Sequence, residues 1–159
     1  MVAGSATVGA NDDFAIARYN ANGTLDTTFD TDGKATYDFS SGNDAAAGIA
    51  VQSDGKIVAG GYAATAGNRD FALLRVTSAG ALDTSFDTDG KVTTAIGSAS
   101  DEAKDLAITA SGSIVLVGES DNGLNLDMAV VRYTASGALD TPFDTDGKKP
   151  LAAGTGYDT

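Results

Sequence analysis

A ten-residue block that recurs at a fixed interval constrains this chain more than any other feature. The block begins at Leu25, Leu82 and Leu139, so the period is 57 residues with no insertion between copies. Nine of its ten positions are identical in all three copies, and only Thr28, Ser85 and Pro142 differ. Self-similarity at a fixed period is typical of proteins built from stacked, like units. We therefore expect the chain to fold as one repeat array.

The rest of each copy follows in the same register. The repeat-equivalent sets are Arg18, Arg75 and Arg132; Asp44, Asp101 and Asp158; Gly4, Gly61 and Gly118; and the triplets that begin at Asp13, Asp70 and Asp127. Each set has one member in each copy of the repeat, so we expect its members to have the same role in every repeat.

Each period contains four short segments rich in β-branched, aromatic and aliphatic residues, separated by glycine turns that are typical of strands. We expect the first strand at 34–39 and 91–96, the second at 48–52 and 105–109, the third at 56–61 and 113–118, and the fourth at 70–76, 14–19 and 128–133. The third and fourth strands are apolar on both faces, as at 114–117 and 71–74, which predicts cover on both sides. No helical periodicity is present to supply that cover, so sheets must stack on sheets.

These patterns predict an all-β fold made of β-propeller blades, each with four antiparallel strands. A β-solenoid of stacked repeats is the alternative, although 57 residues is long for one coil. One array should run over residues 1–159, with a partial blade at 1–33, blades at 34–90 and 91–147, and the start of a further blade at 148–159. Ring closure usually needs about four blades, so we expect a partial ring or one completed by other chains.

Composition excludes several classes of function. The net charge is −12, which opposes binding to nucleic acid and to anionic membrane surfaces. No apolar run approaches the length needed to insert into a membrane, and the first five residues do not form a signal peptide. Cysteine and histidine are both absent, which removes thiol nucleophiles, histidine bases and the usual zinc sites. No catalytic motif remains, so we expect a protein that is not an enzyme and has no catalytic residues.

The recurring aspartates are the strongest candidates for chemistry. The candidate metal ligands are Asp26, Asp30, Asp32, Asp83, Asp87, Asp89, Asp140, Asp144 and Asp146. Two aspartates at alternate positions followed by glycine resemble the opening of a calcium loop, although the closing glutamate is missing. The alternative is a plain turn, in which Asp-Gly supplies the bend and the first aspartate accepts a backbone N–H group. We expect no cofactor other than a candidate Ca²⁺ ion at these loops.

The three equivalent arginines lie on the fourth strand of each repeat. We expect each to form a bidentate bond with an aspartate of its own or an adjacent blade, either in the set that contains Asp44 or in the aspartate loops. Recognition of a carboxylate or a sugar is the functional alternative for these arginines.

Three segments resemble one known family. The block that runs from Leu82 to Thr94, together with residues 50–61 and 13–20, is similar to the delta-60 repeat. This resemblance spans essentially the whole chain and implies a propeller-like tandem array in a secreted or cell-surface bacterial protein. It also implies adhesion or surface assembly, and it carries no catalytic residue onto this sequence.

Three functions remain open on these grounds. The first is a structural or adhesive scaffold that binds copies of itself, flanking repeats, or a protein or glycan ligand. The second is a calcium-stabilised binding module. The third is a propeller-class hydrolase, such as a lactonase or glycosidase, with carboxylates near the ring centre.

Overall fold

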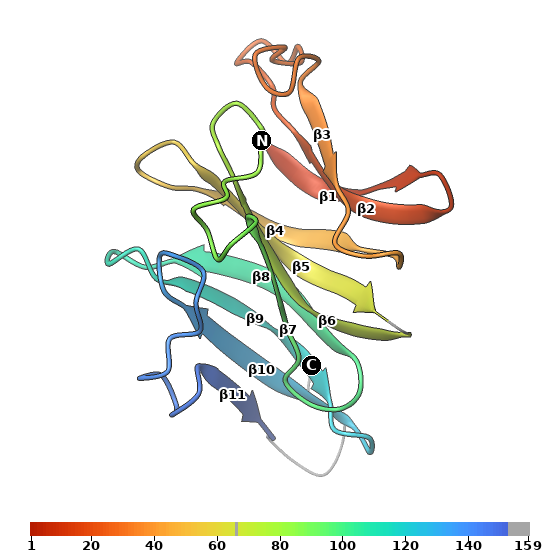
Figure 1. Ribbon diagram of the computed structural model, residues 1–159, viewed down its shortest axis with the longest axis vertical. Coiled ribbons are helices and arrows are strands. Elements are labelled where there is room, and N and C mark those ends of the chain that lie inside the picture. The colour runs from red at the N-terminus through yellow and green to blue at the C-terminus, as the bar shows by residue number, and fades with distance from the viewer. Residues whose placement is uncertain (66, 153–159) are drawn as a thin grey trace.

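The computed structural model describes residues 1–65 and 67–152, which form eleven strands in three successive antiparallel sheets and contain no helix (Figure 1). The first sheet contains β1 (Val2–Val8), β2 (Asn11–Ala17) and β3 (Lys34–Tyr37). The second contains β4 (Ala45–Val51), β5 (Ile57–Thr65), β6 (Asn68–Val76) and β7 (Lys91–Thr94). The third contains β8 (Asp101–Ile108), β9 (Ile114–Asp121), β10 (Leu126–Tyr133) and β11 (Lys148–Leu151). The prediction of an all-β fold with propeller-type, four-stranded blades is confirmed.

The sheets group the strands with a different boundary from the predicted one. Residues 34–39 were expected to open a blade, but β3 closes the preceding sheet, with Phe14 opposite Tyr37 and Ala17 opposite Lys34. The same holds for β7 and β11, which close the second and third sheets. The physical reason is that the aspartate block is a loop within one sheet, so it returns the chain to the strand that precedes it. A four-stranded unit therefore runs from Ala45 to Thr94.

The first strand of each complete sheet is longer than its sequence indicates. β4 and β8 begin at Ala45 and Asp101, three and four residues before the predicted starts at 48 and 105. Both strands contain a bulge, at Ala46/Gly48 and at Ala103/Asp105. A run of small or acidic residues has low strand propensity, so tertiary pairing with β5 and β9 decides their conformation.

The three sheets follow one another in chain order (Figure 1), and an apolar layer of buried side chains lies at each of the two junctions. Leu73 and Leu74 are adjacent in β6 and are both fully buried, but they belong to different layers. Leu74 packs with Phe14 and Ile16 of the first sheet. Leu73 packs with residues of the third sheet that include Leu116. The central sheet is therefore covered on both faces by neighbouring repeats, as the doubly apolar strands predict.

The predicted hairpin turns are also present. Gly55 and Gly112 adopt φ values of 85° and 88° in the turns that precede β5 and β9. Only glycine adopts this conformation without strain, which explains why glycine recurs at this repeat position.

Candidate functional sites: aspartate loops and sheet junctions

Each aspartate block forms a tight turn that is stabilised by its own carboxylates. The Asp26 Oδ1 atom accepts hydrogen bonds from the backbone N and the hydroxyl of Thr28, at 3.0 and 2.7 Å. At the other end of the block, Asp32 accepts the backbone N–H of Lys34 at 2.8 Å. Asp30 lies between them with a φ of 45°, which an aspartate tolerates better than most residues.

The second and third blocks repeat these contacts with one change. Asp89 and Asp146 accept the backbone N–H groups of Lys91 and Lys148, both at 2.9 Å, as Asp32 does for Lys34. Pro142 replaces Thr28 in the third block and has no N–H group to donate to Asp140. The turn interpretation of the aspartate blocks is therefore confirmed.

The nine predicted ligands do not converge on a shared point. Within residues 1–65 and 67–152, no three of these loop carboxylates form a group that could hold one ion. The first and last aspartates of the blocks direct their oxygens to backbone N–H groups of their own turns or to the arginines described next, and Asp144 accepts a hydrogen bond from Lys149 at 3.1 Å. Calcium at the loops stays a prediction.

The predicted arginine–aspartate pairing is confirmed, and the partner is the first aspartate of the block in the same sheet. The Nε atoms of the arginines lie 2.8 Å from Asp26, 2.7 Å from Asp83 and 2.7 Å from Asp140; the pairs are Arg18–Asp26, Arg75–Asp83 and Arg132–Asp140. The expected bidentate geometry was wrong, because only the Nε atom bonds the aspartate, and the terminal guanidinium nitrogens of Arg18 and Arg75 bind other groups. Each guanidinium also stacks on the phenylalanine of its block, at 5.2, 4.6 and 4.7 Å from the ring centroid; the rings are Phe29, Phe86 and Phe143.

The terminal nitrogens of two of these arginines reach the next sheet. Arg75 Nη1 donates to the carbonyl of Ala135 at 2.7 Å, and Arg18 Nη1 donates to the equivalent carbonyl of Ser78. A backbone bond runs beside each one, from Asp30 N to Ala79 O and from Asp87 N to Ser136 O. Each internal junction therefore has the same pair of polar contacts, directed from one sheet to the next.

The central pair is the most buried and the most densely connected. Lys56 Nζ lies 2.9 Å from Asp83 Oδ2, and the hydroxyl of Ser85 donates to Asp83 Oδ1 at 2.7 Å. The hydrogen bond from Ser85, followed by that from Lys56, holds the pKa of Asp83 well below its ordinary value of 3.8. Asp83 therefore stays ionised, and its role is to fix Arg75 rather than to exchange protons.

Among the residues that the structure describes, two outer sheet faces are open, and they are repeat equivalents of the faces that pack inside the chain. On the third sheet, Val117, Met128 and Leu151 are 40%, 41% and 39% exposed and line a groove of about 310 Å³. On the first sheet, Val2 is 53% exposed and lines a groove of about 560 Å³ formed by β1, β2 and β3. The equivalents of Met128 and Val2 in the second sheet, Phe71 and Ala59, are fully buried.

A group of three carboxylates lies where the first sheet meets the second, and sequence reasoning missed it. Oxygens of Asp13, Asp38 and Asp44 lie within 4.8 Å of one another. Asp13 and Asp44 occupy recurring positions, but alanine stands at the equivalents of Asp38, positions 95 and 152. The departure of Asp38 from the repeat is the signal that could have found it, whereas the predicted acids all recur with the period.

Two comparisons with known proteins bear on the family. The family described as "Domain of unknown function (DUF5122) beta-propeller" matches residues 1–29, 52–86 and 109–143, which is more than half of the chain. The second and third segments start one period apart, as the sequence repeat requires. No curated protein matches the chain. Within the part that the structure describes, there is also no helix long and apolar enough to span a membrane. The chain belongs to the DUF5122 β-propeller family.

Proposed function

We propose that this chain is a non-enzymatic scaffold whose sheets stack end to end on copies of itself or on flanking repeats. The observation that carries the proposal is the relation between the two open faces. They are the same two surfaces, by repeat position, that pack against each other at both internal junctions. A third-sheet face placed on the first-sheet face of another unit would therefore repeat a contact that the chain already makes twice.

One pair of facing repeat positions is apolar at every junction, which supports this stacking. At the second junction, Leu116 of the third sheet lies against Gly60 of the second sheet. A Cβ atom on Gly60 would lie 2.4 Å from Leu116 Cδ2, so Leu116 fills the space that a side chain at position 60 would need. The equivalent pair at the first junction is Ala3 and Ala59, both in the same apolar layer. At the proposed external junction the pair is Val117 and Val2 of the next unit. All three pairs are aliphatic or glycine, so no polar or charged side chain would be buried at this position of the external junction.

Unused polar groups on the third sheet support the same arrangement. Within the described residues, Arg132 Nη1 and the backbone N of Asp144 have no partner beyond their own sheet. Their equivalents in the first two sheets donate to carbonyls of the following sheet. On a stacked unit, the carbonyls of Ala21 and Asn22 would occupy the matching positions. An apolar face with donors at its rim is typical of a protein interface.

The delta-60 resemblance adds a setting for the scaffold. It implies a secreted or cell-surface bacterial protein that takes part in adhesion, with a protein or a glycan as the ligand. The acidic surface suits this role, because net charge keeps an exported array soluble.

The stacking test uses two charge substitutions and their mixture. Val117→Asp disables the third-sheet face, and Val2→Asp disables the first-sheet face. We expect wild-type chains to form assemblies that grow with concentration, measured by light scattering and electron microscopy, and each variant alone to stay monomeric. A mixture of the two variants should form one-to-one dimers, because each retains the face that the other has lost. Leu124→Asp is the control, since Leu124 is 88% exposed in the turn between β9 and β10.

Two results would refute the proposal. The first is a wild-type chain that stays monomeric at all concentrations. The second is association that survives both Val117→Asp and Val2→Asp, which would place the contact elsewhere. Turnover of a sugar or lactone substrate would instead favour the hydrolase alternative.

A further inference from the structure

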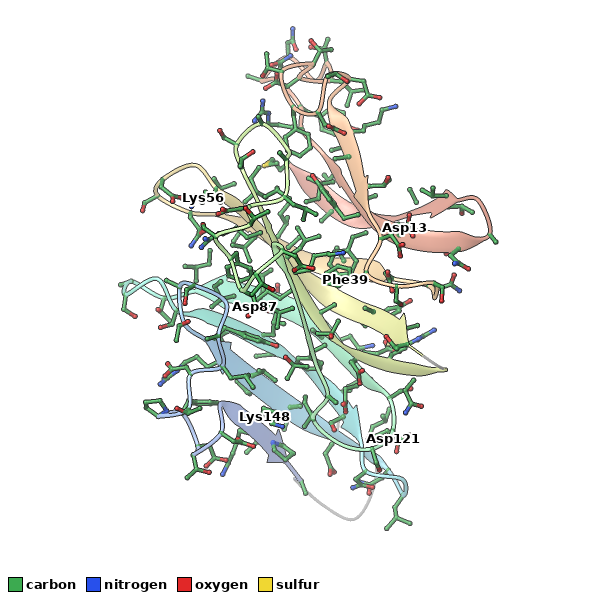
Figure 2. The ribbon with its side chains drawn as sticks, viewed as in Figure 1. Asp13, Phe39, Lys56, Asp87, Asp121 and Lys148 are labelled. Atoms are coloured by element: carbon green, nitrogen blue, oxygen red, sulfur yellow. The ribbon has the colours of Figure 1, made fainter. Side chains whose placement is uncertain are left out.

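Two buried carboxylates and one exposed carboxylate gather at the junction of the first and second sheets, and within the described residues none of them forms an ion pair. Asp13 belongs to β2, and Asp38 and Asp44 begin and end the loop that links β3 to β4. This loop is fixed to the first sheet, because Asp44 N donates to Asp12 O at 2.6 Å and Asp12 N donates to Asn43 Oδ1 at 3.0 Å. Figure 2 labels Asp13 and Phe39 in this region.

The carboxylate of Asp13 is buried and has no partner. Only 7% of the residue is exposed, and within the described residues its side chain makes no hydrogen bond or ion pair. Its oxygens lie within 4.8 Å of those of Asp38 and Asp44, so the side chain is directed into the group. Burial, followed by the charges of Asp38, Asp44 and Asp12, raises the pKa of Asp13 above its ordinary value. An unpaired buried carboxylate is costly, which indicates a missing positive charge.

Asp44 is held in position by the backbone on both sides of the junction. Its Oδ2 atom accepts the N–H of Phe39 at 2.8 Å, and its Oδ1 atom accepts the N–H of Ala64 at 3.0 Å. The backbone N–H of Ser40 adds a third hydrogen bond, so the carboxylate keeps about one of its roughly four lone-pair sites. The nearest cationic side chain, Lys91, donates to the backbone carbonyl of Asp38 at 3.0 Å and not to a carboxylate of the group.

The other repeats show that this arrangement is not a requirement of the fold. In the third sheet the equivalent of Asp13 is Asp127, which accepts amide hydrogen bonds from Asn122 and Asn125 at 2.8 and 3.0 Å. At the second junction Ala95 replaces Asp38, so no third carboxylate is present. Among residues 1–65 and 67–152, only the first junction brings three carboxylates together, one of which lacks a hydrogen-bond partner.

We propose that Asp13, Asp38 and Asp44 form a binding site for one Ca²⁺ ion. Carboxylate oxygens are the ligands that calcium prefers, and this chain has no histidine or cysteine to favour a softer metal. Two oxygens on one Ca²⁺ ion lie at most about 4.6–5.2 Å apart, given Ca–O distances of about 2.3–2.6 Å. The spread of the three oxygens fits within this limit. Exposed Asp38 gives the ion a route from solvent, and water completes its coordination.

The proposed ion would join two sheets. Asp13 lies in the first sheet, while Asp44 precedes β4 and binds Ala64 of β5 in the second. Bound calcium would therefore stabilise the first junction, and this role does not depend on the stacking proposed above.

The test measures calcium binding to the full chain after treatment with EDTA and dialysis. Titration calorimetry with CaCl₂ should give one ion per chain, and the melting temperature should rise with calcium concentration. Asp38→Ala copies the alanine at position 95, so it should fold normally and lose both the binding heat and the melting shift. Asp13→Asn should do the same. Asp32→Ala is the matched control and should bind as the wild type does.

Several outcomes would overturn the site. An absence of heat and of any calcium-dependent melting shift in the wild type would refute it, and would favour a proton shared among the carboxylates. Binding of three ions per chain, of which one is lost in Asp32→Ala, would assign calcium to the aspartate loops instead. Unchanged binding in Asp38→Ala would also exclude the proposed ligand set.

Discussion

Replacing Arg75 by methionine should cost far more stability than replacing its equivalent Arg18. The side chains of Arg75 and Asp83 are 8% and 10% exposed, against 21% and 24% for Arg18 and Asp26. Breaking a buried ion pair costs about 3–5 kcal/mol, because the remaining charge is left without its partner. Asp83 would retain Lys56 and Ser85, so we expect the lower end, about 3 kcal/mol.

The exposed pair gives the matched comparison. Arg18→Met should cost about 1 kcal/mol or less, since solvent screens pairs of this kind. For a chain of this size a loss of 1 kcal/mol lowers the melting temperature by about 2–4 °C. The expected shifts are therefore about 6–12 °C for Arg75→Met and about 2–4 °C for Arg18→Met.

Calorimetry and urea denaturation, followed by circular dichroism, would measure both variants under identical conditions. Methionine keeps the apolar stem and removes the guanidinium contacts, so the measured loss combines the ion pair, the bonds to Ala135 and Ser85, and the stacking on Phe86. Equal losses of unfolding free energy in the two variants would refute the argument that burial determines how much each ion pair contributes to stability. A loss below about 0.5 kcal/mol for Arg75→Met would refute it too.

Two further predictions concern single positions. Gly61→Ala should destabilise the fold by about 1–3 kcal/mol, because the new Cβ atom would lie 2.0 Å from the Ala45 carbonyl oxygen. Gly4 holds the equivalent position in the first sheet, and a Cβ atom there would meet nothing within 4 Å. Gly4→Ala should therefore leave the free energy of unfolding unchanged in chemical denaturation. Asp13→Asn should stabilise the chain in EDTA above about pH 4 and have little effect below it. Burial raises the folded-state pKa of this carboxyl above 3.8, so wild-type stability falls as pH rises through the folded value. Melting curves across pH 3–7 that run parallel for Asp13→Asn and wild type would contradict this reasoning.

The repeat made the fold class and most strands predictable, but it did not show which strands share a sheet. Residues 34–39 follow the aspartate block, and periodicity is equally compatible with a strand that opens one blade or closes another. The pairing of Phe14 with Tyr37 places this strand in the preceding sheet. Such a pairing depends on the geometry of the intervening loop, which the strand propensities of single residues do not reflect.

The candidate sites divide in the same way. The aspartate turns and the arginine pairs were predictable, because both recur with the period and rest on local geometry. The direction of Arg75 toward Ala135 was not, since its acceptor is a backbone carbonyl without any residue preference. The group around Asp13 was also missed, because Asp38 enters it only through the path of one loop.

The position of β3 beyond the aspartate block has a consequence for building arrays of chosen length. The strand that completes each sheet is encoded after the loop, so a cut inside that loop removes a four-residue edge from an otherwise finished sheet. A cut just after Tyr37 or Thr94 leaves every sheet whole. Duplication of any 57 consecutive residues preserves the order of the strands, whichever residue the copy starts from. Separable modules, in contrast, require the chain to be divided just after Tyr37 or Thr94.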